Sequence, residues 1–177
     1  MRIYDGNGEH VEGQRRERSR AGAARRSVGV ADYAVTVDDT TLVTSGLGSC
    51  VAVGLFDGGT AAGLLHVMLP TANGRAVDNP AKFADTGVRT LLRSLDDVGA
   101  SEQELSAKIA GGSEMITFRS RERSIGDRNV EAVRDALDEA GIPLLDEDVG
   151  GEEGRSVEFD LSGDLHIRTA RAGERVL

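Results

Sequence analysis

Two apolar segments joined by a short turn constrain this fold more than any other feature of the sequence. Residues 51–56 and 64–69 are predicted strands, and 57–60 between them carries two adjacent glycines. A turn of this kind joins antiparallel strands, so the start of the first strand lies near the end of the second. The pattern therefore predicts that Cys50, which precedes the first strand, and His66, in the second, can be neighbours.

Cys50 is the only cysteine of the 177 residues, and glycines precede it at positions 46 and 48. A lone cysteine is usually a small buried hydrophobe, and a histidine among leucines is usually a hydrogen-bonded core residue. Packing does not explain Gly46 and Gly48, since glycine before a strand allows positive φ or a close approach of the backbone to a ligand. A thiol in such a turn, followed by an imidazole, is the smallest set of groups for cysteine nucleophile chemistry.

Five collinear motifs resemble the CheD family, whose members are chemoreceptor glutamine deamidases of taxis pathways. The motifs are Thr-Ser-Gly-Leu-Gly-Ser-Cys-Val-Ala-Val at 44–53, Gly-Leu-Leu-His-Val-Met-Leu-Pro at 63–70, Ala-Gly-Gly-Ser at 110–113, Ile-Gly-Asp-Arg-Asn-Val-Glu-Ala-Val at 125–133, and Asp-Val-Gly-Gly at 148–151 with Arg-Ser-Val-Glu at 155–158. The resemblance covers roughly residues 29–172, which makes it far more specific than a cysteine and a histidine alone.

The resemblance implies an amidohydrolase that converts glutamine side chains on the cytoplasmic helices of chemoreceptors to glutamate and releases ammonia. Such a reaction needs a nucleophile, donors for the oxyanion and a proton for the departing ammonia. Cys50 is the candidate nucleophile, expected as a thiolate whose pKa is lowered by an adjacent imidazolium, and His66 is the candidate acid and base. The resemblance assigns Thr44 the role of orienting the imidazole through its hydroxyl.

Donors for the oxyanion are expected in the turn that carries Cys50. Backbone N–H groups in the turn Gly48-Ser49-Cys50 are candidates, because glycine-containing turns can aim successive amides at one point. Gly111 and Gly112 are candidates for lining the substrate groove, and an equally good interpretation makes them a turn at the end of a strand.

The sequence predicts neither a cofactor nor a metal. One cysteine and three scattered histidines lack the spacing of metal ligands. Gly46 and Gly48 taken alone suggest a phosphate loop, but the lysine and hydroxyl residue of such a loop are missing.

The remaining pattern predicts a single α/β domain over residues 29–177. A helix is expected over 84–95 after the start signal Asn79-Pro80, and a second from about Asp127, where Asp127, Arg128 and Asn129 are interpreted as a helix start rather than a site. Further strands are expected at 106–110, 144–149, 157–161 and 165–167. These elements predict an α/β sandwich with mixed sheets, and the family resemblance implies layers of helix, sheet and sheet.

Residues 1–28 are predicted to be a disordered, arginine-rich tail without hydrophobic periodicity. The net charge of −9 and the acidic body argue against a nucleic-acid partner. No apolar stretch approaches the ~20 residues that span a bilayer, so membrane insertion is not expected. An unpaired cysteine suits the reducing cytoplasm, which is the expected location.

Two other functions stay open. The chain could act as a binding module that regulates a response-regulator phosphatase of the CheC family, through the groove that would hold a receptor helix; the resemblance supports both roles. A different thiol amidase or thioesterase would fit Cys50 and His66 but not the other motifs. Catalytic turnover distinguishes the deamidase from the binding module.

Overall fold

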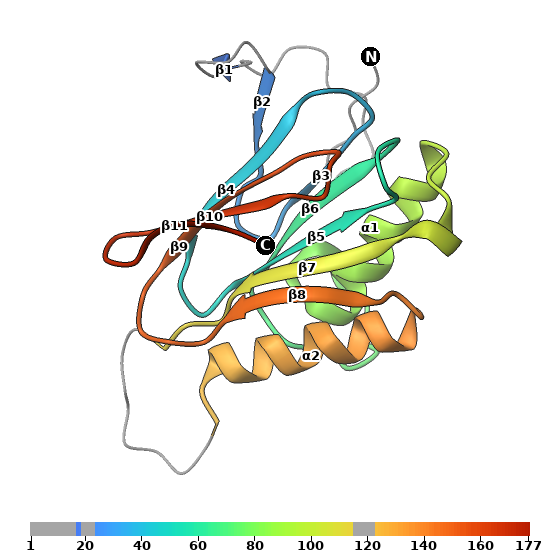
Figure 1. The fold of residues 1–177 in the computed structure, drawn as a ribbon. Coiled ribbons are helices and arrows are strands. Elements are labelled where there is room, and N and C mark those ends of the chain that lie inside the picture. The colour runs from blue at the N-terminus through green and yellow to red at the C-terminus, as the bar shows by residue number, and fades with distance from the viewer. Residues whose placement is uncertain (1–16, 19–23, 115–122) are drawn as a thin grey trace.

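The computed structural model describes residues 17–18, 24–114 and 123–177 (Figure 1). Its strands are β1 (Glu17–Arg18), β2 (Ala24–Ser27), β3 (Tyr33–Thr36), β4 (Thr41–Leu47), β5 (Val51–Phe56), β6 (Ala62–Val67), β7 (Ser106–Gly111), β8 (Leu144–Val149), β9 (Arg155–Phe159), β10 (Leu165–Thr169) and β11 (Gly173–Val176). Its helices are α1 (Ala84–Asp97) and α2 (Ile125–Glu139), with short 3-10 turns at Pro80–Lys82 and Glu102–Glu104.

The strands form two mixed sheets packed face to face. One has the order β1-β2-β4-β9-β10-β11 and the other β3-β6-β5-β7-β8. The β2–β4 and β7–β8 pairs are parallel and the other pairs are antiparallel. Both helices lie on the side of the five-stranded sheet away from the other sheet (Figure 1). The predicted α/β sandwich with helix, sheet and sheet layers is confirmed.

Two apolar cores explain this layering. In β6, side chains alternate between the faces of the sheet, as the two-residue period of a strand requires. Leu65 and Val67 pack with the helices, whereas Leu64 packs between the sheets. His66 is therefore on the face that meets the second sheet.

The predicted hairpin is confirmed as β5 and β6, which are antiparallel with Val51 opposite Val67. The strand predicted at 64–69 lies two residues earlier, at Ala62–Val67. Its end is set by Met68 and Leu69, whose N–H groups bond to the carbonyl of Lys82 instead of continuing the ladder.

Both predicted helices are present, with small differences at their starts. Asn79 caps the 3-10 turn before α1 by accepting a bond from the N–H of Ala81. Helix α2 begins at Ile125, earlier than expected, because Ser124 is its cap and accepts from the N–H of Asp127. Among the described residues, neither helix is long and apolar enough to cross a membrane.

Strand β2 falls within residues 1–28, the range predicted to be a tail. It pairs in parallel with β4, and Val28 beside it is buried. The packed structure thus reaches residue 24. Apart from β1, the rest of that range lies outside the described residues, and its nature stays a prediction.

Candidate active site

Three strands bring Cys50, His66 and Thr44 to one region between the sheets. His66 lies on β6 opposite Ala52, so Cys50, two residues before Ala52, is at the diagonal position across the hairpin. Thr44 comes from β4 of the other sheet. Cys50 is partly buried and packs against the core between the sheets, whereas His66 is fully buried.

The hydrogen bonds of Thr44 decide where His66 carries its proton. The Thr44 hydroxyl donates to the carbonyl of Val28 at 2.8 Å, and its oxygen lies 2.8 Å from Nδ1 of His66. A carbonyl can only accept, so the single hydroxyl hydrogen points to Val28 and the Thr44 oxygen accepts from Nδ1–H of His66. In the neutral imidazole, Nε2 is then the unprotonated nitrogen and can accept a proton.

Burial disfavours the charged forms of both groups. Burial lowers the pKa of His66 to about 4 and raises the pKa of the Cys50 thiol. Nε2 of His66 has no hydrogen-bond partner among the described residues. The sequence led us to expect a thiolate beside an imidazolium. The pKa shifts of both groups instead favour a neutral thiol and a neutral base.

The turn that carries Cys50 is held by its carbonyl groups. The carbonyl of Gly48 accepts from the backbone N–H of Ser113 at 2.8 Å and from its hydroxyl at 3.0 Å. The Cys50 carbonyl accepts from the N–H of Gly112 at 2.8 Å. The Ser49 carbonyl accepts from Nδ2 of Asn129 at 2.8 Å. All three peptide carbonyls are thus fixed by groups from the end of β7 and from α2.

These bonds narrow the choice of oxyanion donors. The N–H of Gly48 bonds to the carbonyl of Gly46, and that of Gly112 bonds to Cys50. The N–H groups of Ser49 and Cys50 have no acceptor among the described residues. They are the backbone donors of this turn that are free to bind a substrate oxygen.

Gly111 and Gly112 lie against the backbone of Cys50, and both are buried. A Cβ on Gly111, whose φ is +124°, would lie 2.2 Å from the Cys50 carbonyl oxygen. A Cβ on Gly112 would lie 2.3 Å from a methyl carbon of Val130. Close approach to the turn that carries Cys50 and to α2 therefore accounts for both glycines.

The sequence did not predict the roles of Val28, Ser113 and Asn129. Each makes a hydrogen bond to Thr44 or to the backbone of the turn that carries Cys50. Asn129 is fully buried and does more than begin a helix. The signal was its position on the apolar face of α2, four residues before Val133, where a polar side chain needs a buried partner. A backbone carbonyl such as that of Val28 leaves no such signal.

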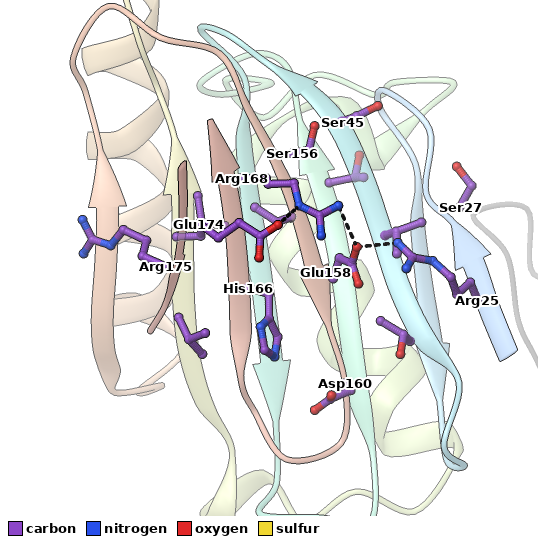
Figure 2. A pocket seen from close by; sticks show the side chains of 16 residues that line it. Arg25, Ser27, Ser45, Ser156, Glu158, Asp160, His166, Arg168, Glu174 and Arg175 are labelled. Atoms are coloured by element: carbon purple, nitrogen blue, oxygen red, sulfur yellow. Dashed lines mark hydrogen bonds and ion pairs between the residues drawn. The ribbon is translucent and has the colours of Figure 1, made fainter. Parts of the chain in front are cut away.

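A separate pocket of about 500 Å³ lies on the outer face of the six-stranded sheet. Figure 2 shows a row of charged side chains across it, in which Glu158 pairs with both Arg25 and Arg168. Thr44 is among the residues that line this pocket, whereas Cys50 and His66 are not. Arg168 also pairs with Glu174, so four of the pictured charges form one chain of ion pairs, which is typical of a solvated sheet face rather than of a ligand site.

Comparisons with known proteins identify the family of the chain. The family model described as CheD chemotactic sensory transduction matches residues 68–169, more than half of the chain. A Haloarcula marismortui protein, "Probable chemoreceptor glutamine deamidase CheD", is 44% identical over 96% of each chain. The chain belongs to the CheD family. The CheD relative of Thermotoga maritima, "Chemoreceptor glutamine deamidase CheD", is 46% identical over 86% of this chain and 96% of its own.

Likeness to solved structures is weaker than likeness to CheD sequences. The crystal structure of the Bacillus licheniformis hypothetical protein YfiH aligns with a TM-score of 0.43 and 15% identity. The alignment covers 64% of this chain and 48% of that protein.

Proposed function

We propose that this chain is a cysteine-dependent glutamine deamidase that acts in the cytoplasm on chemoreceptor helices. The names of its CheD relatives support the reaction and the substrate class. The observation that carries the proposal is the bond from His66 Nδ1–H to Thr44, because it leaves Nε2 as an unpaired base beside the hairpin position of Cys50.

In the first half-reaction, Nε2 of His66 takes the thiol proton as Sγ of Cys50 attacks the side-chain amide carbon of glutamine. The carbonyl oxygen becomes an oxyanion, which the N–H groups of Ser49 and Cys50 would bind. His66 then gives the proton to the departing nitrogen, the C–N bond breaks, and ammonia leaves a thioester on Cys50.

In the second half-reaction, a water molecule replaces ammonia. Nε2 of His66 takes a proton from the water as its oxygen attacks the thioester carbon. Collapse of the tetrahedral intermediate breaks the C–S bond, and the proton returns to Cys50. The products are a glutamate side chain and the free thiol.

Exposed apolar side chains support a helical protein as the substrate. Met68, two residues after His66, and Ile125, at the start of α2, are each 39% exposed. An apolar rim beside a polar site suits the amphipathic surface of a receptor helix.

The same rim supports the second role, binding of a CheC-family phosphatase. Saturating phosphatase should then slow deamidation, and excess receptor fragment should displace it, because exclusive binding is reciprocal. A ternary complex with full activity would separate the two surfaces.

The decisive experiment measures ammonia release from a purified receptor cytoplasmic fragment. We expect Cys50→Ala to fold and to release none, and Cys50→Ser to retain at most a trace. Ser156→Ala, on the outer face of β9, is the control for removing one polar atom and should match the parent. Parental turnover in Cys50→Ala would exclude the cysteine mechanism.

A further inference from the structure

Asn129 joins the two segments that carry Cys50 and His66. Its Nδ2 donates to the Ser49 carbonyl at 2.8 Å and to the Met68 carbonyl at 3.0 Å. Ser49 precedes β5 and Met68 follows β6, so both lie just beyond the last paired residues of the hairpin. The amide group of Asn129 bridges the hairpin at the point where its own hydrogen bonds end.

The amide nitrogen of Asn129 carries two hydrogens, so this one atom can donate to both carbonyls. Both acceptors are carbonyls, which identifies the amide atom that faces them as the nitrogen. Oδ1 of Asn129 is buried and has no partner in the described part of the chain. An unpaired buried acceptor is destabilising, so packing alone does not account for an asparagine here.

The bond to Ser49 also fixes the N–H of Cys50. The C=O of Ser49 and the N–H of Cys50 belong to one peptide unit, and the described peptide bonds are all trans. In a trans peptide these two groups point in opposite directions from a rigid plane. By holding the carbonyl on one side, Asn129 turns the Cys50 N–H to the other side, where it meets no acceptor in the described chain.

We propose that Asn129 is a positioning residue that orients one of the two oxyanion donors of the site, the backbone N–H of Cys50. This inference rests on the proposed function, in which Cys50 attacks a carbonyl group. Asn129 acts through the Ser49–Cys50 peptide and does not itself touch the substrate. Ser113 holds the preceding Gly48–Ser49 peptide through two bonds, so the turn has a second fixed plane.

Two small reagents distinguish an effect of Asn129 on the oxyanion donor from an effect on the position of the Cys50 thiol. With p-nitrophenyl acetate, Sγ of Cys50 attacks the acetyl carbon through an oxyanion, p-nitrophenolate leaves, and an acetyl thioester forms. With iodoacetamide, Sγ displaces iodide from carbon and no oxyanion forms. The ratio of the two rates on Cys50 therefore measures the oxyanion donors, and it does not depend on any receptor substrate.

In Asn129→Ala we expect acylation to fall about 100-fold, the usual loss for one oxyanion donor, while alkylation stays within about threefold of the parent. Asn129→Asp keeps the shape of the side chain but removes its two donor hydrogens, so its two rates should change as in Asn129→Ala. Rates are divided by the folded fraction from an unfolding curve. Ser124→Ala, which removes the cap of α2 and leaves Ser49 untouched, is the control and should keep the parental ratio.

Three results would overturn the role of Asn129. They are an unchanged ratio, a parallel loss of both reactions, and a failure of both variants to fold, which would make Asn129 a requirement of the fold. A parent that reacts with both reagents but releases no ammonia from receptor fragments would contradict the proposed function alone.

Discussion

The hydroxyl of Thr44 accepts a hydrogen bond from Nδ1 of His66 across the interface of the two sheets, at 2.8 Å. Because Thr44 gives its own hydrogen to Val28, the bond has one direction and selects one tautomer of the imidazole. The role that the family resemblance assigned to Thr44 is thus physically available here, and its contribution to catalysis is a prediction.

Thr44→Ala should lower kcat for ammonia release about 10- to 100-fold, by analogy with the loss when the partner that orients a metal-bound histidine is removed. Thr44→Ser keeps the hydroxyl and should recover most of the rate. Steady-state kinetics on a receptor fragment checks both. Equal rates for Thr44→Ala and the parent would remove Thr44 from the mechanism.

His66 should make the protein less stable in mild acid. Burial lowers the folded-state pKa of His66 to about 4, so the unfolded chain, with a pKa near 6.5, binds the proton first. The contribution of the neutral His66 to the free energy of unfolding is complete above about pH 6.5. It is lost as the pH falls toward 4, and the total loss is about 3 kcal/mol. Urea unfolding at about pH 7.5 and pH 5 should show a loss about 2 kcal/mol larger in the parent than in His66→Gln. Identical losses would contradict a buried neutral imidazole.

Cys50 should be alkylated slowly at neutral pH in the free protein. Burial raises the pKa of its thiol, so iodoacetamide should react faster only at a pH above that at which an ordinary cysteine responds. A pH series of alkylation rates tests this. Fast alkylation below the range of a free cysteine would instead indicate a thiolate paired with an imidazolium.

Gly111→Ala should destabilise the protein and its nucleophile turn. The new Cβ would meet the Cys50 carbonyl at 2.2 Å on a backbone with φ of +124°, at a cost of about 3 kcal/mol or more. Gly141→Ala is the matched control, since its φ is +70° and nothing lies within 4 Å, and it should cost about 1 kcal/mol. Denaturant unfolding gives both values, and equal costs would contradict the close contact.

Two truncations should differ in their effect on stability and turnover, because only the longer one removes β2. Deleting residues 2–16 removes no described element and should leave the unfolding midpoint and turnover near the parental values. Deleting residues 2–27 removes β2, which pairs with β4 up to Val43, and should lower both. The turnover loss is expected because Val28, which accepts from Thr44, would lose the strand that precedes it. Equal behaviour of the two truncations would show that β2 is dispensable.

The sequence predicted those parts of the fold in which local pattern and burial agree. The apolar runs of β5 and β6 and the helical spacing of Val88, Leu91 and Leu95 are set by the same core that they build. Strand β2 escaped prediction because its arginines carry no apolar alternation, and its place is set by pairing with β4. Its register is a tertiary property.

For the candidate site as well, the sequence predicted some features and not others. Cys50 and His66 could be proposed because their side chains can carry the chemistry, and Thr44 could be proposed through the family resemblance. The bonds of Asn129 to two backbone carbonyls join residues 80 and 61 positions apart in the chain, which no local pattern records. The neutral state of His66 likewise follows from complete burial, a property of the packed sheets.

The contact of Thr44 with His66 also makes the site sensitive to sliding of one layer over the other. Each residue is fixed in its own sheet by backbone pairing, and the bond between their buried side chains spans the interface. A displacement of about 1 Å along the strands would break that bond while every ladder remained intact. On heating, activity would then be lost before secondary structure. The catalytic rate would therefore report the alignment of the two sheets.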